Sequence, residues 1–518
     1  SGVIMGKKVF RTAIILTIFL FAAACKTETA APQVLPTSTV QAAEPLESTA
    51  APTPEPLGDD SIFLTVLYTN DEHGWIEGRE SGSGAATLAG LWADAGYENQ
   101  GDLLILSGGD NWTGPAISTW FDGQSMVAVM NVMGYHAAAI GNHEFDFGLD
   151  VLQTRLAEAE FPYLSANTRY KAGGSTPTDL GIQAYTIVDT GVLRVGLIGL
   201  TLTDTPSITN PEHTAVFDFI DYETALREVV PQVRAEGVDM IIVPAHVCTD
   251  ELIPLASAVS DLNVALLGGG HCHERFAQQI GDTVLISAGD GYASYAYAAF
   301  ELDPGTKDMI SVDYGIAENR GGVEDTDVAQ VVAHWKAETD RELDVVIGYL
   351  EDDLSKRGDR MAALITEAWL AAYPTADVAI TNWGGMRDRI PAGEITMADV
   401  VGVMPFNNVL VDVKMTGAQL ASVLAAGRGD PPVGGIHREN GQWVLNKTGL
   451  PIEPDEMYAV LVNDFMYAGG DNLTMLVEYD PDAYNTSISW RQPVIDWIEA
   501  QETTAEKPLD ALIDALMD

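Results

Sequence analysis

The sequence predicts an α/β protein with two folded domains, and three observations lead to this prediction. The chain has 518 residues, which is too many for one hydrophobic core. It is 47% hydrophobic and 20% charged, as an ordinary globular protein is. Five short apolar runs with β-forming side chains each stop at Asp, Asn or His, which is typical of strands whose carboxyl ends carry a ligand site.

The net charge limits the classes of partner. The chain carries 27 basic and 75 acidic residues, for a formal charge of -48. Such a charge disfavours binding to a nucleic acid polymer or to an anionic bilayer surface, because both are negative themselves. An anionic small molecule would need a strong local positive centre in this protein.

Residues 1–25 are typical of an export signal. Lys7, Lys8 and Arg11 precede an uncharged, mostly apolar run over residues 12–24, which is short for a membrane span. The run ends in three alanines before Cys25, which resembles a bacterial lipoprotein cleavage site with Cys25 as the lipidated residue. Ala22 departs from that pattern, so a plain signal peptide is the alternative. We expect an exported protein, lipid-anchored at the outer face of the cytoplasmic membrane or at the cell surface, or otherwise periplasmic or secreted and soluble.

Residues 26–59 are rich in Ala, Pro, Thr, Ser and Glu and have hardly any large apolar side chain. Such a stretch cannot bury enough surface to offset its ordering entropy, so we expect a semi-extended tether. The chain has three cysteines, too few for a disulfide framework. If Cys25 is lipidated, Cys248 and Cys272 are either free thiols or one bridge.

The five strand-like runs lead into polar loops. They cover residues 62–68, 103–106, 137–140, 240–243 and 264–267. Ligands of α/β sheets lie outside the carboxyl ends of the strands, so these loops should converge on one site. Five of the nine histidines fall in these loops, which favours a site over five unrelated polar turns.

The loops contain the ligand types of a two-metal site. The candidate ligands are Asp71, His73, Asp110, Asn142, His246, His271 and His273. Seven oxygen and nitrogen ligands are too many for one tetrahedral ion, but they suit two divalent ions that share a carboxylate. The mixed set favours Zn, Mn, Fe or Co over Ca. Such a pair lowers the pKa of a bound water and clamps phosphoryl oxygens, so hydrolysis of a phosphate ester is expected.

His143 stands apart from this ligand set. Asp146, three residues later, can orient its imidazole so that His143 acts as an acid at a bound anion.

After the first half, apolar residues at helical spacing predict a connecting helix over 323–354.

The second half has no candidate metal cluster and offers arginine and aromatic residues in glycine-rich turns instead. Arg387 suits a phosphate or carboxylate through its planar fork. Phe406 and Phe465 can stack on a flat base, although each taken alone would more often be a core residue.

These motifs resemble one known family. The series TNDEHG, SGGD, GNHEFD, PAH and GGHCH is similar to the calcineurin-like metallophosphoesterase domain of the 5′-nucleotidase family, and NWGGMR, MPFNN and DFMYAGGD are similar to its carboxyl-terminal domain. The resemblance covers about residues 60–515. It implies a four-layer α/β/β/α metallophosphoesterase domain over 60–322, the connecting helix over 323–354, and a mixed α/β nucleotide-binding domain over 355–518.

The resemblance also implies residue roles. One metal would be held by Asp71, His73, Asp110 and His273, and the other by Asp110, Asn142, His246 and His271. His143 and Asp146 would form the catalytic pair that stabilises the phosphoryl group. The substrate would be bound by Arg357, Asn382, Gly384, Gly385, Arg387, Phe406, Phe465 and Asp471, with the two phenylalanines around the base and Asp471 on the ribose. Two departures from the family affect the phosphate grip and the base pocket: the sequence around Arg357, where Lys356 and Arg360 are further candidates, and Asn472 in place of a glycine.

The implied function is that of an extracytoplasmic phosphohydrolase of the 5′-nucleotidase type, with a nucleotide as its small-molecule substrate. Alternatives with the same metals are a UDP-sugar hydrolase, a 2′,3′-cyclic-nucleotide phosphodiesterase with 3′-nucleotidase activity, or a thiosulfohydrolase, against which the paired phenylalanines argue. A nucleotide-binding surface lipoprotein is the non-enzyme alternative. We expect a monomer or a weak dimer, with membrane contact only through the lipid.

Overall fold

The structure is a computed structural model that describes residues 61–80, 82–97, 102–426 and 430–517. The predicted leader over 1–25, the predicted lipidation site at Cys25 and the predicted tether over 26–59 lie outside the described residues. Among the residues that are described, no helix combines the length and the hydropathy needed to cross a membrane.

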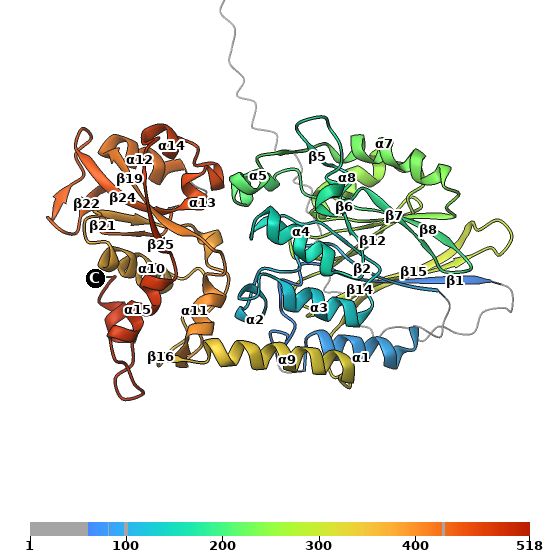
Figure 1. Ribbon diagram of the computed structural model, residues 1–518, viewed down its shortest axis with the longest axis horizontal. Helices are drawn as coiled ribbons and strands as arrows, with labels where there is room; N and C mark the ends of the chain where they lie inside the picture. Colours follow the sequence, from blue (N-terminus) through green and yellow to red (C-terminus); the bar gives the residue numbers. More distant parts are fainter. Residues whose placement is uncertain (1–60, 81, 98–101, 427–429, 518) are drawn as a thin grey trace, which may run out of the picture. The chain divides into compact units, whose positions relative to one another are not determined.

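Two sheets form the centre of the first half of the chain (Figure 1). In spatial order the first sheet contains β15 (Met309–Glu318), β14 (Ser294–Leu302), β1 (Ile62–Thr69), β2 (Asp102–Ser107), β3 (Ala137–Ala139), β4 (Tyr163–Leu164) and β6 (Ile182–Gln183). The second contains β12 (Arg275–Ile280), β13 (Thr283–Ala288), β11 (Leu266–Gly268), β10 (Met240–Pro244), β8 (Arg194–Ile198) and β7 (Tyr185–Asp189). The strands next to one another from β1 to β6, and those from β13 to β8, run parallel.

Helices cover the outer face of each sheet. Apolar residues of the first sheet pack against α1 (Ala85–Ala95), α3 (Gln124–Met133), α4 (Leu149–Glu158) and α9 (Thr326–Leu343). Those of the second sheet pack against α7 (Tyr222–Ala235) and α8 (Thr249–Ala258). A third cluster fills the space between the sheets and contains Val66 of β1 and Ile242 of β10. The layer order is therefore α/β/β/α, as predicted.

The alternation of side chains in β1 explains how one short strand serves two layers. Leu64, Val66 and Tyr68 face the second sheet, while Leu67 faces the helices, because successive side chains of a strand point to opposite faces. Both faces are buried, so the strand stands in the sequence as a mostly apolar run, interrupted by Thr65.

The five strand-like runs belong to two sheets and not to one. β1, β2 and β3 lie in the first sheet, whereas β10 and β11 lie in the second. The apolar cluster between the sheets holds them face to face. The polar loops that follow these strands come together across the two sheets, where His246 contacts Gly108 and His271 contacts Asp71.

Several short elements connect these layers without belonging to them. They are α2 (Ala116–Thr119), the 3-10 helix η2 (His143–Phe145), η3 (Thr178–Leu180), α5 (Thr205–Ile208), α6 (Pro211–Thr214), η4 (Ser260–Leu262) and the small sheet of β5 (Thr168–Tyr170) with β9 (Phe217–Phe219).

The connecting helix is shorter than the predicted span of 323–354. Asp325 caps α9 by accepting the backbone N–H groups of Asp327 and Val328, and the helix ends at Leu343. Beyond it, residues 346–350 form β16 (Val346–Leu350), which pairs with β18 (Gly393–Thr396). The β-branched run at 345–347 favours this strand over a continued helix.

The second half is a sheet between two layers of helices. The sheet order is β20 (Val433–Gly434), β17 (Val378–Ile380), β24 (Met457–Asn463), β19 (Val409–Thr416) and β25 (Tyr484–Ser489). One face packs against α10 (Asp359–Ala372), α11 (Met397–Val403), α15 (Gln492–Ala500) and α16 (Asp510–Asp514), and the other against α12 (Gly417–Ala426), α13 (Asp464–Tyr467) and α14 (Met475–Tyr479). A hairpin sheet of β21 (Ile436–Glu439), β22 (Gln442–Leu445) and β23 (Leu450–Pro451) adjoins it.

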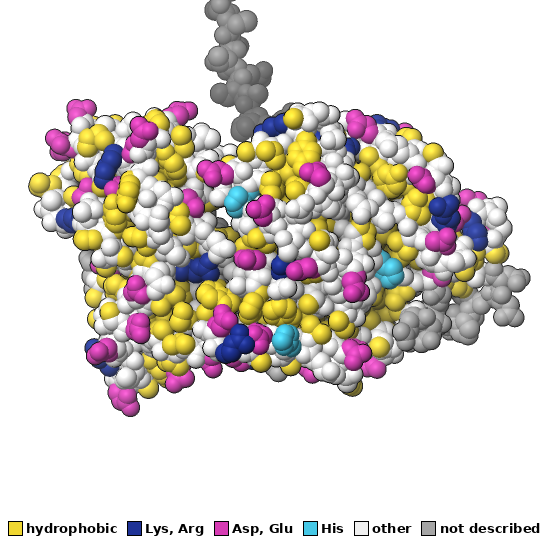
Figure 2. Space-filling view, viewed as in Figure 1, with side chains coloured by type: hydrophobic (Ala, Val, Ile, Leu, Met, Phe, Trp, Pro, Cys, Tyr) yellow, Lys and Arg dark blue, Asp and Glu magenta, His cyan; other side chains and the backbone are white. Residues whose placement is uncertain are grey.

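The acidic residues are dispersed over the face of the molecule seen in Figure 2. Figure 2 shows Asp and Glu side chains scattered singly over the visible face, with few Lys and Arg among them and no single acidic patch on that face. This distribution is that of a solvated surface.

Candidate active site

Five of the seven predicted ligands hold the left-handed backbone conformation. Residues other than glycine rarely adopt it, and such strain gathers at functional sites. These residues are Asp71 (φ 51°), His73 (47°), Asp110 (57°), His271 (70°) and His273 (56°). The fold therefore imposes an unfavourable conformation at the ends of three different strands, and all five side chains serve the same site.

The first group of ligand-type atoms combines Asp71, His73 and His273. Their ligand atoms all lie within 4.8 Å of one another. The Nε2 atoms of the two histidines are 3.2 Å apart, and Nε2 of His273 is 3.4 Å from Oδ1 of Asp71. Asn70 donates to the other carboxylate oxygen of Asp71 at 2.6 Å, which fixes the carboxylate.

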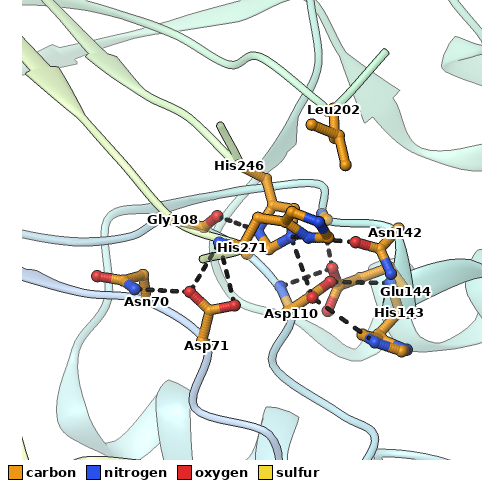
Figure 3. Close-up of polar contacts among 12 residues, drawn as sticks. Asn70, Asp71, Gly108, Asp110, Asn142, His143, Glu144, Leu202, His246 and His271 are labelled. Atoms are coloured by element: carbon orange, nitrogen blue, oxygen red, sulfur yellow. Dashed lines mark hydrogen bonds and ion pairs between the residues drawn. The ribbon is translucent and has the colours of Figure 1, made fainter. Parts of the chain in front are cut away.

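The second group combines Asp110, His246 and His271 in the same way (Figure 3). Nε2 of His246 lies 3.0 Å from Oδ2 of Asp110 and 3.3 Å from Nδ1 of His271. The side-chain oxygen of Asn142 lies 3.2 Å from the same Nε2. The structure thus brings all seven predicted ligands into two groups. That Asp110 is shared by both ions stays a prediction.

The histidines are oriented by their second ring nitrogens. Nδ1 of His73 donates to the carbonyl oxygen of Thr113 at 3.0 Å, and Nδ1 of His246 donates to that of Gly108 at 2.9 Å. Nδ1 of His273 faces the carboxylate of Asp290 at 3.4 Å. In each case Nε2 is the nitrogen that faces the site, and once it carries no proton its lone pair can bind a metal. The donor set therefore fits two divalent cations.

Buried charges set the protonation of these histidines before any cation enters. Burial alone lowers the pKa of His246, but the Asp110 carboxylate overcomes this effect and raises the pKa to about 10. Burial likewise opposes the charged form of His273, and two neighbouring carboxylates raise its pKa to about 9. Burial and the charge of His246 lower the pKa of His271 to about 4. An entering cation must displace protons from the first two.

His143 and Asp146 form the expected pair. The imidazole Nδ1 donates to Oδ2 of Asp146 at 2.7 Å. The hydroxyl groups of Thr113 and Thr209 also donate to this carboxylate, at 2.7 and 3.1 Å. Nε2 of His143 lies 4.0 Å from Asp110, beside the second ligand group. The histidine is therefore held rigidly at the edge of the site.

A cavity of about 230 Å³ joins this site to the second half of the chain. From the first half, its lining includes Asn142, His143, Asp146 and His271. From the second half, it includes Asn382, Gly384, Gly385, Arg387, Phe406, Phe465 and Asp471. Seven of the eight predicted substrate-binding residues thus lie in one cavity with the catalytic pair.

Comparisons with known proteins agree with this arrangement. The profile of the 5′-nucleotidase carboxyl-terminal domain matches residues 346–478. The 5′-nucleotidase of Vibrio vulnificus is 29% identical over 517 residues, covering 86% of this chain and 92% of that protein. Residues 346–478 thus match the 5′-nucleotidase carboxyl-terminal domain, and the chain is similar to a 5′-nucleotidase over most of its length. These likenesses confirm the predicted resemblance to this family and the prediction of a phosphoric ester hydrolase.

Solved structures share the fold of this chain. The 5′-nucleotidase precursor from Thermus thermophilus has a TM-score of 0.73 at 24% identity, covering 86% of this chain and 97% of that chain. The sulfate thiohydrolase SoxB from Thermus thermophilus, in complex with glycerol, has a TM-score of 0.68 at 17% identity, covering 87% and 95%. At these identities the likeness shows the fold alone, and the fold confirms the predicted two-domain α/β class.

Arg357 is the one predicted substrate residue that does not line the cavity. Its Nε donates to the carbonyl oxygen of Trp383 at 3.2 Å. Arg360 forms ion pairs with Asp510 and Asp514, so its guanidinium is engaged away from the cavity. Lys356 lies closer: it lines a small neighbouring cavity with Arg387. Arg357 stays a predicted substrate residue, although it does not line this cavity.

The base pocket depends on a close approach of backbone to ring. Gly470 has no side chain, and a Cβ there would lie 2.3 Å from the ring of Phe465. Asn472, which stands where the family has a glycine, adopts a left-handed φ of 63°, which asparagine tolerates. Asn382 donates to Asp471 at 2.9 Å, which holds the predicted ribose ligand in place.

Sequence reasoning missed three acidic residues beside the ligands. Asp290 orients His273, and no motif pointed to it because it follows another strand, β13. Glu72 and Glu144 are fully buried, and burial raises their pKa values to about 7 and about 8. Both lie inside ligand motifs, TNDEHG and GNHEFD, and this position was the signal that could have found them.

Cys248 and Cys272 form a disulfide, which settles the two alternatives left open by the sequence. Their Cα atoms are 5.3 Å apart. Cys248 lies two residues after His246, and Cys272 lies between His271 and His273. The bridge therefore ties together two loops that carry predicted ligands.

Proposed function

We propose that this protein is a dinuclear-metal phosphohydrolase that removes phosphate from nucleotides, as a 5′-nucleotidase does. The observation that carries the proposal is the shared cavity. It joins the predicted second-metal ligands Asn142 and His271 to the His143–Asp146 pair and to two phenylalanines. This shared lining supports a base bound by the phenylalanines next to a phosphoryl group bound at the metals.

Different residues of the chain would bind the base, the ribose and the phosphate. Phe406 and Phe465 would stack on the base, Asp471 would bind the ribose, and Arg387 would bind the phosphate through its planar fork. Two divalent cations, from among Zn, Mn, Co and Fe, would lower the pKa of a bound water and polarise the phosphoryl oxygens. His143 would donate a hydrogen bond from Nε2 to the phosphoryl group, because Asp146 holds its Nδ1 proton.

The aromatic pair favours a nucleotide over a small inorganic sulfur substrate. A thiosulfohydrolase of the same fold needs no platform for a flat ring, whereas this cavity has one on the second half of the chain. The fold does not distinguish nucleoside monophosphates from UDP-sugars or cyclic nucleotides, so the test must include all of them.

A phosphate-release screen tests the proposal. Purified protein is stripped of metal and given Mn, Co, Zn or Ca in turn, with nucleoside mono-, di- and triphosphates, cyclic nucleotides, UDP-glucose and thiosulfate conjugates as substrates. We expect phosphate release from nucleotides with a transition metal and none with chelator. Nucleotide binding without metal-dependent release would instead support a binding lipoprotein.

The export signal and the lipid at Cys25 belong to the same proposal. They would bring the enzyme outside the cytoplasm, where released nucleosides and phosphate could be taken up, and the acidic surface suits contact with the membrane only through the lipid. Labelling of cells with a fatty acid analogue tests this: the chain should be labelled and its Cys25→Ser variant should not. Label in neither would leave a periplasmic or secreted soluble protein. The oligomeric state, monomer or weak dimer, stays a prediction.

A further inference from the structure

Glu144 lies inside the GNHEFD motif, between the two residues of the predicted catalytic pair, yet it takes no part in the proposed reaction. Its side chain is fully buried and is not part of the lining of the cavity. Three backbone N–H groups donate to its carboxylate. Those of Asp110 and Gly141 reach Oε2 at 3.0 and 2.7 Å, and that of Asn111 reaches Oε1 at 2.7 Å.

These three donors form an anion-binding nest. Gly109 and Asp110 both have positive φ, at 87° and 57°. Successive N–H groups in a turn can point at one anion, and the Glu144 carboxylate accepts those of Asp110 and Asn111. Figure 3 shows Glu144 at this position, beside Asp110. The left-handed backbone of Asp110 is unfavourable for a non-glycine residue. Hydrogen bonds to the Glu144 carboxylate thus stabilise it.

The nest determines where the Asp110 carboxylate lies. Oδ1 of Asp110 accepts the backbone N–H of His143 at 2.8 Å, and Oδ2 of Asp110 lies 3.0 Å from Nε2 of His246. The same glutamate binds Gly141, so it joins the loop after β2 to the loop after β3. The loops approach so closely that a Cβ on Gly141 would lie 2.1 Å from Oδ1 of Asp110.

We propose that Glu144 is a positioning residue for the metal centre: its carboxylate holds the Asp110 backbone in the conformation from which Asp110 serves as a ligand. This inference rests on the proposed function, since it assumes that the two groups bind cations. It assigns Glu144 no contact with substrate. Partners that orient metal ligands typically change metal affinity by about 10–100-fold when they are replaced.

Glu72 serves as a comparison. It shows whether metal affinity depends on the positioning of Asp110 by Glu144 or only on a buried negative charge. It is equally buried, but its donors are the hydroxyl of Thr69, the hydroxyl of Ser107 and the side-chain amide of Asn111, the last at 2.6 Å. A hydroxyl can reverse and accept a hydrogen bond, whereas a backbone N–H can only donate. Glu72→Gln therefore keeps its partners, while Glu144→Gln sets an amide N–H against a backbone N–H.

The experiment measures Mn²⁺ affinity of the full chain by competition with a fluorescent chelator, without substrate. We expect Glu144→Gln to weaken Mn²⁺ binding at least ~10-fold. Glu72→Gln should weaken it by less than ~3-fold. Thr283→Val is the matched control: it removes one buried hydrogen bond, to the Val264 carbonyl, at the opposite end of β13 from the ligand loops. It should lower stability and leave Mn²⁺ affinity unchanged.

Other results would overturn the inference. Equal losses in Glu144→Gln and Glu72→Gln would mean that only charge matters, and an unchanged affinity in Glu144→Gln would mean that the nest is dispensable. If Glu144→Gln is not recovered folded, Glu144→Asp replaces it. That variant keeps the charge but draws the carboxylate back, so it too should lose ~10-fold, and unchanged affinity would refute positioning.

The wild-type measurement separates this inference from the proposed function. A wild-type chain that takes up neither Mn²⁺ nor Zn²⁺ nor Co²⁺ would overturn the metal centre itself. A wild-type chain that takes up two ions, with Glu144→Gln matching it, would overturn the inference alone.

Discussion

Removal of the Cys248–Cys272 disulfide should destabilise the first domain by an amount that follows from its place in the chain. The two cysteines are 24 residues apart in sequence. For a loop of this length, the restriction of the unfolded chain contributes about 3.5 kcal/mol to the free energy of unfolding. A domain of this size loses roughly 2–4 °C in Tm per kcal/mol, so the double variant Cys248→Ser/Cys272→Ser should melt roughly 7–14 °C lower.

The assay is urea and thermal unfolding of metal-free protein, so that metal binding adds nothing to the stability. Both the parent and the double variant carry Cys25→Ser, which leaves no other thiol in the chain. Dithiothreitol should lower the Tm of the parent to that of the variant and leave the variant unchanged. A loss below about 1 kcal/mol would refute the reasoning, because loop closure over this separation accounts for about 3.5 kcal/mol.

Three further predictions concern the site. His143→Ala should lower turnover by about 10²–10³-fold at unchanged metal content, measured by steady-state kinetics and elemental analysis; loss of bound metal would instead make His143 a ligand. Phe406→Ala and Phe465→Ala should each weaken nucleotide use by about 1–3 kcal/mol in kcat/KM and spare a generic aryl phosphate, and an equal loss on both substrates would contradict stacking. Metal binding should release protons below pH 9, because His246 and His273 have raised pKa values of about 10 and about 9 and bind a cation only when neutral, so affinity should rise with pH and level off above these values. Calorimetry in two buffers of different ionisation enthalpy at pH 7 checks this, and the absence of proton release would contradict it.

Much of the site could be predicted because its chemistry is local in the sequence. An apolar run followed by a polar turn identifies a buried strand and the residues at its carboxyl end, and the rule that ligands lie there holds for any α/β sheet. Asp71 and His73 after β1, or His271 and His273 after β11, were found in this way. The same reasoning could have pointed to Glu144. A carboxylate between two site residues in the sequence has to lie beside them in the site and cannot reach solvent.

The prediction of one helix over 323–354 was wrong for the second part of this range. The helical spacing of apolar residues was extended into a segment of β-branched residues. Residues 345–347 are β-branched, and β16 pairs with β18, which lies over 40 residues further along the chain. Arg357 was predicted as a substrate residue, and in the structure its backbone is left-handed and its guanidinium donates to the carbonyl oxygen of Trp383. Neither outcome depends on nearby residues alone.

The sequence by itself determined the α/β class, the seven ligand types and the His143–Asp146 pair, because each follows from side chains within a few positions of a strand end. Only the tertiary structure decided that Cys248 bonds to Cys272 and that Glu144 gathers N–H groups from two loops. These arrangements arise from the packing of two sheets face to face, which brings together residues up to about 200 positions apart, such as Asp71 and His271. No local sequence pattern specifies that residues so far apart in the sequence come together. Their proximity is set by the packing of the core between the sheets.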